Sequence, residues 1–134
     1  MGIPAANSWA NLTILIVDDD ELIRLTVRNM LKKTGCRVLE AKNGNEGLSI
    51  YREARPDIML TDMLMPEKEG LETIIQIRDF DPDARIIAVS GGGATKNMSF
   101  LELAKKVGAN QILEKPIKPE QLYNAINSVL KTQS

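Results

Sequence analysis

Carboxyl, hydroxyl and amino side chains stand at the ends of successive apolar runs in the sequence. Asp18 and Asp19 follow the first run, Asp62 the third, Ser90 the fourth and Lys115 the fifth. In a parallel sheet, the carboxyl ends of the strands build the site at one edge. The intervals between these residues correspond to one or two strand–helix units, so we expect all five side chains at that edge.

Three carboxylates in one pocket repel one another. Two unit charges about 4 Å apart repel by about 4 kcal/mol at an effective dielectric constant near 20. Either the pKa values of the carboxyl groups rise or a cation lies among them. The sequence has no histidine and a single cysteine, Cys36. Any metal ligands here would be mainly oxygen atoms, which favour a hard cation such as Mg²⁺.

These residue types suit phosphoryl transfer. An aspartate can attack phosphorus, Mg²⁺ can neutralise the equatorial oxygens, and a lysine and a hydroxyl can hold the remaining oxygens. Taken singly, each residue has a simpler explanation: an aspartate can cap a turn, Lys115 can be a solvated charge and Ser90 can open a turn. Their occurrence together at successive strand ends favours a functional site.

The elements that must position these residues alternate along the chain. Segments of helical periodicity separate the apolar runs, and Gly35 stands where the first helix should end. Runs that are apolar on both faces suit a parallel sheet covered by helices on each side. The predicted strands are Leu12–Asp18, Arg37–Ala41, Asp57–Asp62, Arg85–Ser90 and Gln111–Lys115, and the predicted helices follow them near residues 23–31, 46–54, 71–79, 99–107 and 122–129.

The composition limits the class of protein. The 134 residues are about one domain, and 17 basic against 18 acidic residues argue against nucleic acid or an anionic membrane as partner. Without histidine, serine–histidine and cysteine–histidine catalysis are excluded. No apolar run approaches a membrane span of roughly 20 residues, and no secretory signal precedes the first strand, so we predict a cytoplasmic protein.

Four segments together resemble the receiver domain of two-component response regulators, which includes the chemotaxis response regulators. They are "ILIVDDDELIR", "DIMLTDMLMPEKEG", "IIAVSGG" and "GANQILEKPI", in the order of the family. The resemblance implies an α/β fold, a doubly wound (βα)5 flavodoxin-like three-layer sandwich whose five-stranded parallel sheet has the order 2-1-3-4-5. It also implies a stand-alone receiver domain over residues 12–131, with a flexible extension at 1–11, where Trp9 would be a packing anchor, and a tail at 132–134.

The resemblance implies a role in phosphorelay signalling. Asp62 matches the phosphoaspartate of a phosphoprotein that is not an enzyme but assists its own phosphorylation and dephosphorylation. The metal site would comprise Asp18, Asp19, Asp62 and the backbone carbonyl of Leu64. The phosphoryl group would come from a sensor histidine kinase or a histidine phosphotransfer protein.

The resemblance also implies a conformational switch. Ser90 matches the switch hydroxyl, and Lys115, in a cis peptide bond with Pro116, matches the lysine that reaches the phosphoryl group. The output would be a protein target or a homodimer that binds the face formed by helix 4, strand 5 and helix 5. Aromatic and aliphatic residues that could contribute to this face, or simply pack in the core, are Phe100, Leu103 and Tyr123.

Three positions depart from the family pattern. Ile112 replaces the usual tyrosine or phenylalanine three residues before the lysine, so we expect the output to use the loop and helix after strand 4. Leu64 and Gly92 have no polar side chain that could orient an attacking water. We therefore expect a comparatively long-lived phosphorylated state, because in-line attack gains little from proximity here.

Two alternatives remain. The first is a Mg²⁺-dependent phosphohydrolase similar to the haloacid dehalogenase family, with Asp18 and Asp20 as its Asp-x-Asp motif. That family needs a further acidic pair downstream of the lysine, which this sequence lacks. The hydrolase interpretation would also leave Asp62 without a role. The second is a docking receiver that is never phosphorylated. For Asp20 itself, we predict an N-cap of the first helix, where its carboxylate would accept backbone N–H bonds near the positive end of the helix dipole.

Overall fold

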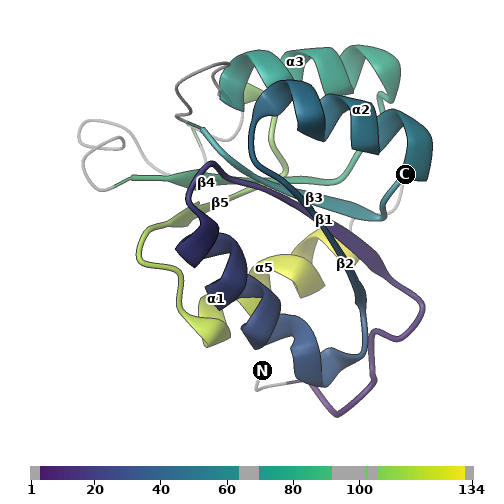
Figure 1. Ribbon diagram of the computed structural model, residues 1–134, viewed down its shortest axis with the longest axis vertical. Coiled ribbons are helices and arrows are strands. Elements are labelled where there is room, and N and C mark those ends of the chain that lie inside the picture. Colours follow the sequence, from purple (N-terminus) through teal and green to yellow (C-terminus); the bar gives the residue numbers. More distant parts are fainter. Residues whose placement is uncertain (1–3, 64–69, 92–101, 103–105, 132–134) are drawn as a thin grey trace.

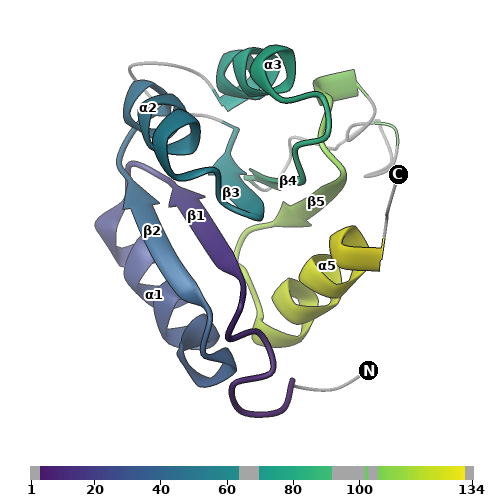
Figure 2. The same cartoon turned by 90° about the vertical axis from the view of Figure 1, so that its right-hand side faces the viewer.

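The strand order of the sheet determines which residues meet at its edges. The structure, a computed structural model, describes residues 4–63, 70–91, 102 and 106–131. Its five parallel strands have the order β2-β1-β3-β4-β5 (Figures 1 and 2), which confirms the predicted topology. The elements are β1 (Thr13–Val17), α1 (Glu21–Leu31), η1 (Lys32–Thr34), β2 (Arg37–Ala41), α2 (Gly44–Ala54), β3 (Ile58–Asp62), α3 (Gly70–Phe80), β4 (Ile86–Ser90), β5 (Gln111–Glu114) and α5 (Pro119–Lys131).

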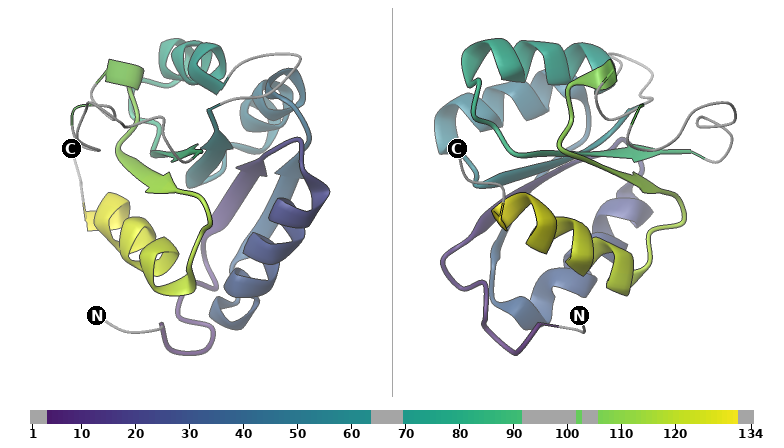
Figure 3. Two further views of the ribbon diagram at one scale, coloured as in Figure 1. Left: turned by 90° about the vertical axis from the view of Figure 1, so that its left-hand side faces the viewer. Right: turned by 180° about the vertical axis from the view of Figure 1, so that it is seen from behind.

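The helices form two layers around the sheet. Helices α2 and α3 cover one face, and α1 and α5 cover the other (Figures 1 and 3). Every residue of β3 and β4 is buried, as the apolar character of these runs on both faces predicts. The helix expected near residues 99–107 lies mostly outside the described residues. Within the parts of the chain that are described, we find no helical segment with the length and apolarity that a membrane crossing demands.

Helix α1 begins where the sequence indicated, but Gly35 caps the short helix that follows α1 rather than α1 itself. Asp20 is the N-cap, and its Oδ1 accepts the N–H of Leu22 at 2.9 Å, as predicted. At the other end, α1 continues into the short 3-10 helix η1. Gly35 then turns the chain with φ 79°, a left-handed conformation that glycine adopts without a steric penalty.

The turn before β1 packs against both helices of its layer, at the foot of Figure 2. The N–H of Trp9 donates to the carbonyl of Thr34 at 2.9 Å, and the indole is only 8% exposed. This ring meets Tyr123 of α5 edge to face at 6.1 Å between centroids. The hydroxyl of Tyr123 donates to the carbonyl of Met30 in α1. Trp9 therefore joins η1, the continuation of α1, to α5.

We expect Trp9→Ala to lower the free energy of unfolding by about 3 kcal/mol, because it deletes a large buried ring and leaves a cavity. Urea unfolding followed by circular dichroism measures this change. Tyr123→Phe keeps the ring contact and should cost about 1 kcal/mol through the lost hydrogen bond. The control is Leu22→Ala, whose side chain is exposed and should be nearly neutral. A Trp9→Ala value as small as the control would contradict this account.

Candidate functional site

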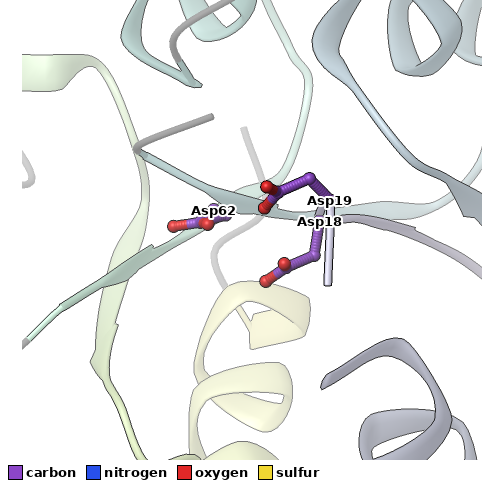
Figure 4. Close-up of side chains that lie close together, drawn as sticks. All are labelled: Asp18, Asp19 and Asp62. Carbon is purple, nitrogen blue, oxygen red and sulfur yellow. The ribbon is translucent and has the colours of Figure 1, made fainter. Parts of the chain in front are cut away.

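Three carboxylates gather at the carboxyl ends of β1 and β3. One oxygen each from Asp18, Asp19 and Asp62 lies within 4.8 Å of the other two (Figure 4). Asp18 and Asp62 are 2% and 6% exposed, whereas Asp19 is open to solvent. The acidic cluster predicted from the strand ends is therefore present, with two buried members and one exposed member.

The pairing of the strands brings the acidic residues together. β1 and β3 are parallel neighbours with Val17 opposite Thr61, so their next residues emerge side by side. The N–H of Asp18 continues the ladder to β2, donating to the carbonyl of Ala41 at 3.1 Å. Its Oδ1 accepts the N–H of Asp20 at 2.8 Å, which orients the carboxylate. The backbone thus fixes Asp18 at both its amide and its side chain.

Lys115 supplies a positive charge to the cluster from the end of β5. Its Nζ lies 3.3 Å from Oδ2 of Asp62 and 3.5 Å from Oδ2 of Asp18. Its own N–H donates to the carbonyl of Ser90 at 2.8 Å, which ties the ends of β4 and β5 together. The Lys115–Pro116 peptide bond is cis, as the resemblance implied.

Burial and neighbouring charges shift the pKa values of the groups in the site. Burial raises the pKa of Asp18, and the nearby charge of Asp62 adds to the rise, while the N–H of Asp20 and the ammonium of Lys115 oppose it. Burial also disfavours charge on Lys115, but Asp18 and Asp62 together outweigh it and raise the lysine pKa. Among the described residues, three carboxylates and one ammonium give the cluster a formal charge of minus two when all four groups are ionised. The charge and the all-oxygen donor set fit a hard divalent cation.

Ser90 is buried at the end of β4, with only 1% of its surface exposed. Its hydroxyl donates to the carbonyl of Gly91 at 3.0 Å. A Cβ added to Gly91 would meet no atom of the described residues within 4 Å. The structure therefore places Ser90 at the same edge as Lys115, with its hydroxyl bonded locally.

The remaining predicted residues lie apart from the cluster or outside the described residues. Leu64 is among the latter, as are Gly92, Phe100 and Leu103. Tyr123 is 4% exposed and packs in the core, which removes it from any output surface and leaves the packing explanation. Ile112 lies in β5 opposite Ala88 and is also buried.

Two residues that our sequence analysis did not single out support the site. A Cβ added to Gly70 would lie 2.0 Å from the carbonyl oxygen of Asp62, so only glycine fits where α3 begins. The N–H of Gly70 donates to the carbonyl of Met63 at 2.8 Å. On α1, Arg24 donates from Nη1 to the carbonyl of Asp18 at 2.6 Å. Gly70 is the last residue of the segment "DIMLTDMLMPEKEG", so the sequence could have indicated its importance. The contact of Arg24 with Asp18 could be found only from the folded structure.

Comparisons with known proteins agree with this geometry. The response regulator receiver domain model matches residues 14–127. The chemotaxis protein CheY of Thermotoga maritima is 37% identical over 119 residues, 88% of this chain and 97% of that protein. Sporulation initiation phosphotransferase F of Bacillus subtilis is 30% identical over 124 residues, 92% of this chain and 98% of that protein.

Solved structures show the same fold. A response regulator receiver domain protein from Clostridium thermocellum superposes with a TM-score of 0.79 and 33% identity, covering 89% of this chain and 94% of that one. For CheY4 of Vibrio cholerae the TM-score is 0.78 with 29% identity, covering 88% and 98%. Because the family model spans most of the chain and these relatives match over nearly their whole length, the chain belongs to the response regulator receiver domain family of two-component signalling.

Proposed function

We propose that Asp62 accepts a phosphoryl group from a sensor histidine kinase or a histidine phosphotransfer protein. The observation that carries the proposal is the set of charges around Asp62, a buried carboxylate with two further carboxylates and the ammonium of Lys115 beside it. Family membership supports it. A phosphotransferase is also among the relatives, by its name.

The proposed reaction is an in-line displacement at phosphorus. An oxygen of Asp62 attacks the phosphorus of a phosphohistidine, so that an O–P bond forms as the P–N bond breaks. The bonding electrons return to the ring nitrogen, and a ring that carries a proton on its other nitrogen leaves as neutral imidazole. The Nζ of Lys115, now 3.3 Å from Oδ2 of Asp62, is within reach of a phosphoryl oxygen on that carboxylate. Asp18, Asp19, Asp62 and the carbonyl of Leu64 would hold Mg²⁺, which when bound supplies positive charge to the phosphoryl oxygens.

The switch would begin at Ser90. Its hydroxyl now donates to the carbonyl of Gly91, and a phosphoryl group on Asp62 offers stronger, charged acceptors at the same edge. Turning toward these oxygens would release the Gly91 carbonyl and move the chain that follows β4.

The output partner would bind the face that contains β5 and α5. A groove of about 550 Å³ runs along these two elements, and its lining includes Ile112, Lys115, Gln121 and Ala125. Because Lys115 belongs both to this groove and to the acidic cluster, a change at Asp62 can reach the groove directly. A protein target or a second copy of this chain would bind there.

The hydrolase alternative is not favoured. Asp20, the second acid of its Asp-x-Asp motif, caps α1 through Leu22, and the described cluster comprises Asp18, Asp19 and Asp62 instead. The chain also belongs to the receiver family. A docking receiver that is never phosphorylated is the alternative that the next experiment tests.

We expect wild-type protein to gain one phosphoryl group when incubated with acetyl phosphate and Mg²⁺, as measured by intact mass. Asp62→Asn removes the attacking oxyanion and should gain none. The matched control, Asp20→Asn, keeps an N-cap side chain and should be phosphorylated like wild type. No gain in wild type, or an equal gain in Asp62→Asn, would contradict the proposal and favour the docking receiver.

We expect Mg²⁺ to raise the thermal stability of wild type but hardly that of Asp18→Asn. At a concentration about 100 times Kd, selective binding to the folded state stabilises it by about 2.7 kcal/mol. Without metal, Asp18→Asn should be more stable than wild type near neutral pH. A carboxyl group whose pKa is raised on folding stabilises less as pH rises above its unfolded value, and the amide removes that penalty.

Thermal unfolding with and without Mg²⁺, measured between about pH 4 and 8, tests both statements. Asp20→Asn is again the control, because it keeps all three residues of the cluster and should respond to Mg²⁺ like wild type. An Asp18→Asn protein that Mg²⁺ stabilises as much as wild type would show that the ion binds elsewhere.

We expect the phosphorylated state to last longer than minutes with Mg²⁺ present and no phosphatase, since Leu64 and Gly92 cannot orient water through their side chains. Leu64→Asn introduces such a group and should shorten the lifetime several-fold, whereas Leu64→Met should leave it unchanged. Loss of the phosphoryl mass with time measures the lifetime. Hydrolysis of wild type within minutes would show that another group orients the water.

A further inference from the structure

Arg24 of α1 links the acidic cluster to the neighbouring strand β2. Its Nη1 donates to the main-chain carbonyl of Asp18 at 2.6 Å, and its Nε lies 3.1 Å from Oε1 of Glu40. Its side chain is only 15% exposed. The guanidinium therefore holds two partners at once, one in the loop after β1 and one in β2, through the rigid fork that arginine provides.

The carbonyl that Arg24 holds belongs to the peptide group between Asp18 and Asp19. Because a peptide group is planar, fixing its oxygen fixes the direction in which the chain enters Asp19. The carboxylate of Asp18 is oriented separately, by the N–H of Asp20. Asp19 is exposed, so its orientation depends on the backbone that carries it. Arg24 thus contacts the peptide group that leads into Asp19, the exposed member of the cluster.

Glu40 holds Arg24 in this position. Its second carboxylate oxygen pairs with Arg28, one helical turn further along α1. In the sheet, Glu40 lies opposite Ile16 of β1, two residues before Asp18. The chain of contacts from Arg28 through Glu40 and Arg24 to the Asp18 carbonyl therefore joins α1, β2 and the loop that carries the acidic pair.

We propose that Arg24 is a positioning residue for the acidic cluster, which holds the Asp18–Asp19 peptide so that both carboxylates converge on one cation. This inference rests on the proposed function, since it requires that the cluster binds Mg²⁺. Arg24 acts through the Asp18–Asp19 peptide, and the described contacts place its guanidinium on the Asp18 carbonyl and on Glu40 rather than on the carboxylates of the cluster. Residues that orient metal ligands in this way typically change metal affinity by about 10–100-fold when mutated.

The charge of Arg24 and its positioning contact predict opposite changes in Mg²⁺ affinity when Arg24 is replaced. Removing a cation from the neighbourhood of an acidic site should strengthen Mg²⁺ binding if charge alone matters. Loss of the positioning contact should weaken it. Arg24→Met and Arg28→Met each delete one positive charge and one contact of Glu40, but the described contacts place only Arg24 on the Asp18 carbonyl. Arg28→Met is therefore the matched control.

The experiment is a calorimetric titration of metal-free protein with MgCl₂, on wild type and both variants. We expect Arg24→Met to weaken Mg²⁺ affinity by about tenfold and Arg28→Met to change it by less than about twofold. In metal-free protein, the backbone amide resonance of Asp19 should shift and its order parameter fall in Arg24→Met but not in Arg28→Met. Equal or tighter binding by Arg24→Met, or equal weakening in both variants, would overturn the proposal.

Two further arms separate the possible causes of a change. Urea unfolding shows whether Arg24→Met is folded, and if it is not, the charge-conserving Arg24→Lys decides: weaker Mg²⁺ binding than wild type supports the proposal and wild-type affinity overturns it. Arg24→Lys, which cannot hold both partners in one fork, should fall between wild type and Arg24→Met. Failure of wild type to bind Mg²⁺ contradicts the proposed function as well, whereas wild-type binding with unchanged affinity in Arg24→Met contradicts this inference alone.

Discussion

Repulsion between the buried carboxylates of Asp18 and Asp62 is the main electrostatic cost of this fold. Asp18 and Asp62 lose most of their hydration at the edge of the sheet, and one ammonium group, that of Lys115, faces them. Such an arrangement opposes folding unless other parts of the molecule compensate. The central strands do so, because the aliphatic residues that precede Asp62 in β3 and Ser90 in β4 are fully buried between two helical layers. Under the proposed function, the excess negative charge favours a cation, which when bound would supply positive charge to the phosphoryl oxygens.

Much of the fold follows from local sequence. The ends of the predicted strands lie within one residue of the observed ones, because the apolar runs are short and polar residues interrupt them on both sides. The different roles of the three aspartates after β1 also have a local cause. Asp20 directly precedes a helical pattern, so its carboxylate caps α1, while Asp18 and Asp19 join Asp62. Parallel strand order then predicts which ends meet.

Other features of the site depend on contacts between segments that the sequence separates widely. From the sequence alone, Arg24 is one of several charged residues of α1. Only the packing of α1 beside β2 shows that its side chain reaches Glu40 and the Asp18 carbonyl. Gly70 is required because the chain comes back to the Asp62 carbonyl, a distance that no periodicity encodes. Tyr123 gave an ambiguous signal, since a tyrosine on a helix suits a surface and a core equally well until Trp9 covers it.

The isoleucine at position 112 limits the contacts through which a conformational change at Asp62 could be transmitted to the face on β5 and α5. Isoleucine has no hydroxyl that could exchange one hydrogen-bond partner for another, and this side chain is packed in the core opposite Ala88. The link that remains among the described residues is the backbone. The N–H of Lys115 donates to the carbonyl of Ser90, so displacement of the residue at the end of β4 acts on the residue at the end of β5. The same lysine contacts Asp62 and lines the groove on β5 and α5, which makes it the shortest connection between the acidic cluster and that face.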